Sequence, residues 1–266
     1  MERLISIMKS DFEEFHSTRK ISRAEKLSKD IKMHVNHNEY PSYFFGNPEA
    51  KFVLVHLKPK QVDNYSDVHE ESFKFTDFDE YFGFHRYYGK IHYGEDTTIK
   101  LKSSFDAKQV KFIKPFNVIN FNDANGNFSN LEKVIDDKLQ LELLPFGSNS
   151  FETNKVESAK ESLQPYVEIL LDTITSQERD YVVFCGKVFE TLLQPYIVFK
   201  EDHAFKLPKV KGGIAVNYSR FSNVTLEFNN KRFSAGIAQS FAQMGINMSE
   251  YGKKCSELYN LSKSLK

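Results

Sequence analysis

Apolar residues in this chain follow two spacings, and the alternation between them predicts a mixed α/β fold. Residues 51–57 (KFVLVHL) and 180–186 (DYVVFCG) are short apolar runs, which are typical of strands buried on both faces of a parallel sheet. Residues 156–174 place apolar side chains three and four positions apart, as an amphipathic helix does. A charged N-terminal segment, residues 1–35, has similar helical spacing and predicts one or two further helices.

Shorter patterns predict the remaining elements. Three further strands are expected, at residues 116–121, 139–146 and 212–222. Three further helices are expected, in KVFETLLQPYI, SAGIAQSFAQMG and MSEYGKKCSELYNLSKSL. Apolar strands that alternate with amphipathic helices favour a three-layer α/β/α sandwich with a mainly parallel central sheet.

We expect a single domain, residues 1–266, because no repeat and no linker divides the chain. Residues 1–40 would be its N-terminal helical segment. Residues 61–110 interrupt the alternation with many aromatic residues among acids and lysines, and we interpret them as an insertion. Its rings would either form a small core of their own or stack on single-stranded nucleic acid.

Composition narrows the class of protein. The chain is 40% hydrophobic and 27% charged, which is ordinary for a folded protein. Its 36 basic and 36 acidic residues balance, which argues against a broadly basic nucleic-acid coat protein but allows a local basic groove. The two cysteines match no metal or redox spacing, and no run resembles a signal peptide or a membrane span. These features favour a cytoplasmic protein that is not associated with a membrane.

The loops after the strands hold the candidate chemistry, because ligands of open α/β sheets bind beyond the carboxyl ends of the parallel strands. His56 and Lys58 follow the first buried strand. Asn217, Ser219 and Arg220 end the last predicted strand, and a guanidinium suits phosphate. Further candidates for contacts with a base or phosphate follow other strands, namely Phe146, Asn149 and Lys187.

Several of these segments together resemble the uracil-DNA glycosylase superfamily. GNPEAKFVLVHLKP is similar to the family's opening turn, buried strand and proline-containing loop. The family's strand that ends in an Asn/Pro loop is similar to ELLPFGSNSF. Its helix, strand and Gly-Lys helix start are similar to ESLQPYVEILLDTI followed by RDYVVFCGKVFETLL. VNYSRFSN falls where the family has its second catalytic loop. The resemblance spans about residues 43–245 without the insertion.

The resemblance implies a protein that binds DNA or a nucleotide base at the sheet edge and hydrolyses an N-glycosidic bond, as these hydrolases of DNA repair do. It implies that Lys58 and Asn217 anchor a base or phosphate. Asp63 or Asn64 would position water, and Phe146 would stack on the base.

The loops depart from the family pattern, which leaves alternatives open. Leu57 or Lys58 occupies the water-activating position, and Asn217 stands where the family has histidine. The chain could therefore be a non-catalytic binding or interaction module on the same fold. It could also be a hydrolase or transferase for a small nucleotide on an unrelated α/β fold.

Neither a cofactor nor a metal is expected. No strand is followed by a dinucleotide-binding glycine pattern. Metal sites can be imagined from the histidines and acids of the charged loops, but charged loops contain such groupings by chance. Lys58 could itself act as a nucleophile if its pKa were depressed. The sequence leaves the oligomeric state open.

Overall fold

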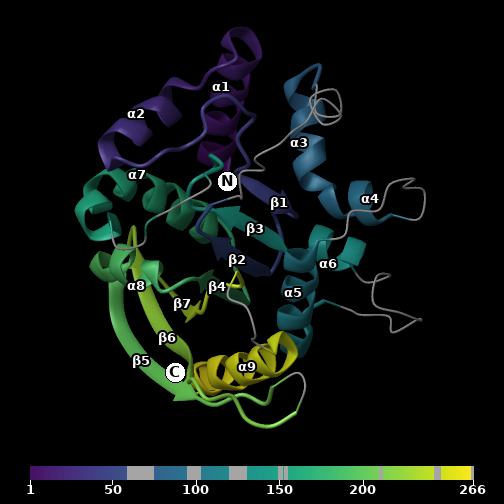
Figure 1. Ribbon diagram of the computed structural model, residues 1–266, viewed down its shortest axis with the longest axis vertical. Helices are drawn as coiled ribbons and strands as arrows, with labels where there is room; N and C mark the ends of the chain where they lie inside the picture. The colour runs from purple at the N-terminus through teal and green to yellow at the C-terminus, as the bar shows by residue number, and fades with distance from the viewer. Residues whose placement is uncertain are drawn as a thin grey trace.

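The computed structural model describes residues 1–58, 75–94, 103–119, 131–148, 152, 155–209, 212–242 and 247–264. These residues form an α/β fold around a seven-stranded mixed sheet of order β1-β3-β2-β4-β7-β6-β5 (Figure 1). The four middle strands β3, β2, β4 and β7 are parallel, whereas β1, β6 and β5 run antiparallel to their neighbours. The strands are β1 (Phe44–Gly46), β2 (Phe52–His56), β3 (Leu139–Glu142), β4 (Tyr181–Cys185), β5 (Ile197–Phe205), β6 (Ser219–Phe228) and β7 (Lys231–Ala238).

Helices precede, separate and follow the strands. Those in the described residues are α1 (Glu2–Thr18), α2 (Ser22–Ile31), α3 (Phe78–Arg86), α4 (Tyr88–Tyr93), α5 (Ser104–Ile113), α6 (Leu131–Asp137), α7 (Val156–Thr175), α8 (Val188–Leu192) and α9 (Met248–Ser264), with 3-10 turns at Lys114–Phe116 and Gln194–Tyr196.

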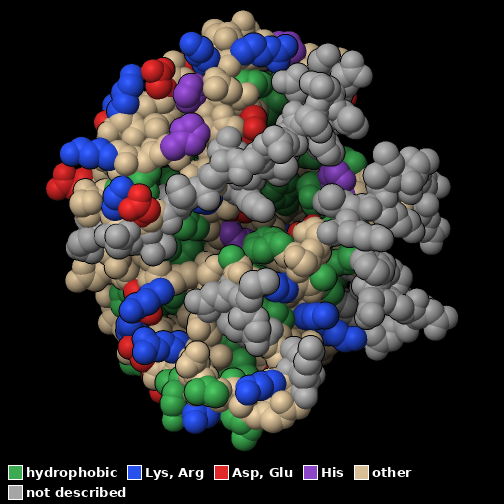
Figure 2. Space-filling model, in the orientation of Figure 1, with side chains coloured by type: hydrophobic (Ala, Val, Ile, Leu, Met, Phe, Trp, Pro, Cys, Tyr) green, Lys and Arg blue, Asp and Glu red, His purple; other side chains and the backbone are tan. Residues whose placement is uncertain are grey.

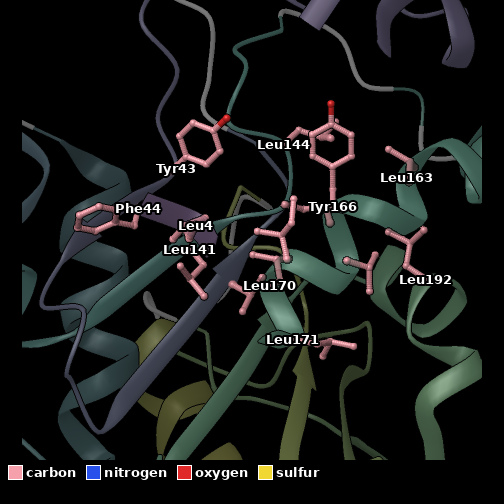
Figure 3. Packing of buried hydrophobic residues seen from close by; sticks show 14 of the residues in the cluster. Leu4, Tyr43, Phe44, Leu141, Leu144, Leu163, Tyr166, Leu170, Leu171 and Leu192 are labelled. Carbon is pink, nitrogen blue, oxygen red and sulfur yellow. The ribbon is translucent and has the colours of Figure 1, made fainter. Parts of the chain in front are cut away.

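The central strands bury both faces, because alternate side chains of each strand enter different apolar clusters. Val53 and Val55 of β2 join a cluster with side chains of α1, α2, α7 and α8. Phe52 and Leu54 join a second cluster with side chains of α5 and α9. Figure 3 shows part of the first cluster, where leucines of α7 gather over the strands. The strands predicted from continuous apolar runs are therefore confirmed, and so is their two-sided burial.

Two predicted strands are wrong over most of their length. Phe116 ends a 3-10 turn that begins at Lys114 and contains Pro115, and Asn117 follows with a φ of 56°. This conformation ends the run, and the described residues 117–119 form no strand. The strand expected at 212–222 instead begins at Ser219 and continues to Phe228.

The helix predicted in SAGIAQSFAQMG is also wrong, because its first part belongs to β7. β6 and β7 form a hairpin that turns at Asn229 and Asn230, both with positive φ (49° and 60°). Two consecutive residues of positive φ are typical of the tight turns that join twisted strands. The small residues of β7 concealed the alternation, since the strand becomes buried on both faces toward its end.

The described part of the aromatic insertion divides between two cores. Tyr93, with Tyr88 and Val110 beside it, forms a small separate cluster with Leu131 and Ile135 of α6.

Other rings of the insertion pack on the N-terminal segment. Phe75 and Tyr81 belong to the first apolar cluster. The ring of Tyr81 stacks on Phe12 with centroids 4.9 Å apart, and its hydroxyl donates to the carbonyl of Pro41. These rings are part of the fold's main core.

Gly46 is required where β1 meets the end of α6. We expect Gly46→Ala to lower the free energy of unfolding by roughly 3 kcal/mol or more, measured by urea unfolding. The new Cβ would lie 2.1 Å from the carbonyl oxygen of Lys138 and 2.4 Å from that of Ile135, at a φ of 92°.

Gly212→Ala is the matched control. Its φ of 89° is similar, but among the described residues no atom other than those of Gly212 and its chain neighbours lies within 4 Å of the added Cβ. It should lose only the backbone strain, about 1–2 kcal/mol. Equal losses in the two variants would show that close packing at Gly46 does not matter.

Candidate polar site at the carboxyl edge of the sheet

The loops after β2 and β3 run side by side at the carboxyl edge of the sheet. Beyond the strands, the amide of Leu143 donates to the carbonyl of His56 at 2.8 Å, and the amide of Leu144 donates to the carbonyl of Leu57 at 2.9 Å. The amino group of Lys58 donates to the carbonyl of Ser148. Lys58 therefore ties the first loop to the second, and its half-buried position lowers its pKa.

One face of β3 and the residue before it bear a row of buried polar side chains, Lys138, Gln140 and Glu142. Alternate residues of a strand share a face, and the intervening leucines enter the opposite core. Lys138 Nζ donates to Gln140 Oε1 at 3.0 Å, and Gln140 Nε2 donates to Glu142 Oε1 at 2.7 Å. The row therefore forms an ordered chain of hydrogen bonds that ends at one oxygen of Glu142.

His56 lies beside Glu142, because the two residues are register partners in the parallel β2–β3 pair. The imidazole is buried, with the rings of Phe105 and Phe241 edge-on at 5.0 Å and 5.4 Å. These two rings form apolar walls around the end of β2.

Helix α5 adds a second set of polar side chains. Gln109 Nε2 donates to Asp106 Oδ1 at 3.2 Å, and the hydroxyl of Tyr93 donates to Asp106 Oδ2 at 2.5 Å. Because Asp106 accepts from the amide nitrogen, it leaves Gln109 Oε1 as a free acceptor. The Gln109 side chain approaches the His56 imidazole in a polar contact, which raises the imidazole's pKa against the larger effect of burial. This contact does not have the geometry of a well-formed hydrogen bond.

Three buried atoms at this edge have no hydrogen-bond partner among the residues that the structure describes: His56 Nε2, Gln109 Oε1 and Glu142 Oε2. We call the three side chains the polar edge site. Leaving a buried polar group unpaired costs about 1–3 kcal/mol, and most such groups in folded proteins are paired. Three together, on adjacent elements, make these side chains the candidate site at this edge, because bound water or a ligand would be needed to pair them.

Burial sets the charge of the polar edge site. It raises the pKa of Glu142 to about 8, against the hydrogen bond from Gln140 and the nearby Lys138 and Lys58. Burial also lowers the pKa of His56 to about 3 and that of Lys138 to about 8. At neutral pH, Glu142 is mostly a neutral carboxyl that can donate from Oε2, and His56 is a neutral imidazole.

Of the suggested residues that the structure describes, two lie at the polar edge site. His56 belongs to the polar edge site, and Lys58 lies at its rim with its amino group on a backbone carbonyl. Lys187 and Asn217 are exposed. Asp63, Asn64 and Asn149 lie outside the described residues.

Phe146 and Ser219 do not offer a surface to a ligand. Phe146 is 1% exposed, and it packs edge-on against Tyr166 beneath the guanidinium of Arg23. Phe146 is therefore a core residue, and its ring has no exposed face on which a base could stack. Ser219 is buried at the start of β6.

The loop that follows the last parallel strand is not the one that the sequence predicted at residues 217–222. The last parallel strand is β7, so the loop that leaves its carboxyl end begins at Gln239 and is described through residue 242. Asn217 instead precedes the antiparallel β6. Asn217 to Arg220 still lie at the same edge, since Phe221 pairs with Ala238, the last residue of β7.

Sequence reasoning missed Gln109, Gln140 and Glu142. A signal was available in KLQLELL, where polar residues alternate with leucines in a run that was predicted as a strand. A strand that is buried on both faces must bury these polar side chains. Gln109 had no comparable signal, because one glutamine on an amphipathic helix does not mark a site.

Within the described ranges, no three His, Cys, Asp or Glu side chains gather as metal ligands would. No helix among these residues is both long and apolar enough to cross a membrane. Two surface hollows, of about 410 Å³ beside α3 and α4 and about 650 Å³ on β5 to β7, include no residue of the polar edge site. No protein-family model, curated protein or solved structure matches the chain.

The raised pKa of Glu142 makes stability depend on pH. Its ordinary pKa of 4.5 applies to the unfolded chain, and the folded value is about 8. The contribution is thus fully present below pH 4.5 and is lost as the pH rises through about 8. Relative to Glu142→Gln, the wild-type free energy of unfolding should fall by up to about 1.4 kcal/mol per pH unit between about pH 5 and pH 8.

Urea unfolding at several pH values measures this difference. Glu25→Gln is the control, because Glu25 is exposed and its pKa is lowered by Lys29, the opposite direction. A wild-type curve parallel to that of Glu142→Gln would mean that Glu142 is ionised in the folded protein.

Proposed function

We propose that the protein is a divergent member of the uracil-DNA glycosylase superfamily that binds a nucleobase at the polar edge site. The observation that favours this function is the group of three unpartnered buried atoms on His56, Gln109 and Glu142. Their position at the carboxyl edge of parallel strands agrees with where open α/β sheets bind ligands. Apolar clusters on both faces of the sheet support the three-layer sandwich that the resemblance implies.

The donors and acceptors suit the edge of a neutral base. The carboxyl of Glu142 donates from Oε2, Gln109 Oε1 accepts, and neutral His56 can do either at Nε2 according to its tautomer. Uracil, hypoxanthine and xanthine each present neighbouring N–H and C=O groups that such a set could pair. Phe105 and Phe241 would supply the apolar surroundings that strengthen these hydrogen bonds.

The same features favour binding over hydrolysis. A general base must be deprotonated at the working pH, and burial holds the Glu142 carboxyl protonated up to about pH 8. Neutral His56 offers no positive charge to a departing base anion. The amino group of Lys58 is engaged by the carbonyl of Ser148 rather than free to act as a nucleophile. Hydrolysis would therefore need a water-positioning group such as Asp63 or Asn64.

Base excision is the first test. The purified protein is incubated with single- and double-stranded oligonucleotides that contain uracil, hypoxanthine or xanthine, and abasic sites are cleaved with alkali. Strand cleavage that is lost in Glu142→Ala would make the protein a glycosylase that uses this site. If no strand is cleaved, binding of the free bases is measured next. Binding would make the protein a binding module, and no binding would make the proposed function wrong.

We expect free uracil or hypoxanthine to bind the wild type in calorimetry, with an affinity that falls as the pH rises through about 8. Glu142→Gln keeps a neutral donor, so it should bind without this pH dependence. Glu142→Ala should bind about 10 to 100 times more weakly, as expected for one buried hydrogen bond. Equal affinities of the two variants for every base would exclude Glu142 from the site.

A further inference from the structure

A basic and apolar segment projects between β5 and β6. From Lys206 to Arg220 the sequence has four Lys or Arg residues and no Asp or Glu, in a chain with no net charge. We call its described residues, 206–209 and 212–220, the basic finger. Lys206, Lys209 and Arg220 are its described cations, and all three are exposed.

The finger is a hydrogen-bonded hairpin anchored in the core. Leu207 is buried in the second apolar cluster, and its carbonyl accepts from the amide of Ala215 at 2.8 Å. The amide of Lys209 donates to the carbonyl of Gly213 at 2.8 Å, and Gly212 turns the chain with a φ of 89°. These hydrogen bonds order the backbone from which the exposed side chains extend, which lowers the entropy cost of binding.

The finger exposes apolar side chains that nothing in the described residues covers. Ile214, Val216 and Tyr218 are 68%, 78% and 60% exposed. The amino group of Lys206 lies 5.1 Å from the centre of the Tyr218 ring. Figure 1 places this segment at the lower end of the molecule beside α9, where Figure 2 shows hydrophobic and basic side chains close together. Aromatic, apolar and basic side chains in one exposed strip are the combination that contacts bases and phosphates.

The base of the finger is connected to the polar edge site. The amide of Arg220 donates to Gln239 Oε1 at 3.3 Å, and the hydroxyl of Tyr251 donates to the carbonyl of Arg220 at 2.6 Å. Gln239 belongs to the segment after β7 that also holds Phe241, whose ring contacts His56. A strand with one base at the polar edge site could therefore continue toward the finger.

We propose that the basic finger binds single-stranded nucleic acid next to the polar edge site. Lys206, Lys209 and Arg220 contact phosphates, and the ring face of Tyr218 not covered by Lys206 stacks on a base. A single strand fits better than a duplex, because Tyr218 needs an unstacked base. The choice of nucleic acid over an anionic membrane rests on the proposed function, since the finger adjoins the proposed base site.

Fluorescence anisotropy of a labelled single-stranded oligonucleotide tests the finger. We expect Lys206→Gln/Lys209→Gln to lower affinity at least about five-fold and to reduce the slope of log affinity against log salt by about one to two. Tyr218→Ala should lower affinity about 5- to 100-fold with little change in that slope. Lys26→Gln/Lys29→Gln is the control, because it removes the same charge from exposed positions of α2.

The outcomes separate this proposal from the base site. Lost oligonucleotide affinity in the finger variants, with free-base binding unchanged, supports the finger; if free bases never bind, the finger stands and the proposed function fails. No oligonucleotide binding by the wild type, or equal losses in the finger and control variants, overturns the finger. Binding that is stronger to anionic phosphatidylserine vesicles than to the oligonucleotide, and is lost in the finger variants, also overturns it in favour of a membrane contact.

Discussion

The parallel pairing of β2 with β3 is the interaction on which the candidate site depends. It places His56 opposite Glu142, and its backbone hydrogen bonds continue beyond both strands into the following loops. A shift of one residue would turn Glu142 toward the first apolar cluster and bring Leu141 to the polar side. The leucines of β3 oppose such a shift, because they would leave the core. Hydrophobic burial on one face thus fixes the polar geometry on the other.

The same burial determines the protonation states of Glu142 and His56. In water, Glu142 would be an anion at neutral pH and His56 would be partly charged. In the sheet, burial raises the pKa of the carboxyl and lowers that of the imidazole, so both are mainly neutral. A neutral set of donors and acceptors can select among ligands by hydrogen-bond pattern, since a mismatched partner leaves buried groups unpaired. It provides little long-range attraction, which must come from another part of the surface.

The sequence predicts best where a single physical requirement determines the pattern. The continuous apolar runs at β2 and β4 are buried on both faces, so their prediction depended on burial alone and is confirmed. β7 was mistaken for a helix because small residues suit both structures, and only its pairing with β4 and β6 decides between them. The polar edge site depends on pairing as well. His56 could be named from its place at a strand end, whereas Gln109 is brought to it only by the packing of α5.

Ligand recognition has two requirements, selectivity and attraction, and two different parts of the structure are suited to them. The polar edge site is buried and mainly neutral, and its three unpaired atoms suit selection of one ligand. The basic finger is exposed and lacks acids, and its charge suits attraction of a polyanion regardless of sequence. Under the two proposals, this division would let a chain with 36 basic and 36 acidic residues engage nucleic acid. Excess positive charge is needed only where phosphates lie, and the finger concentrates it at the edge where the base would bind.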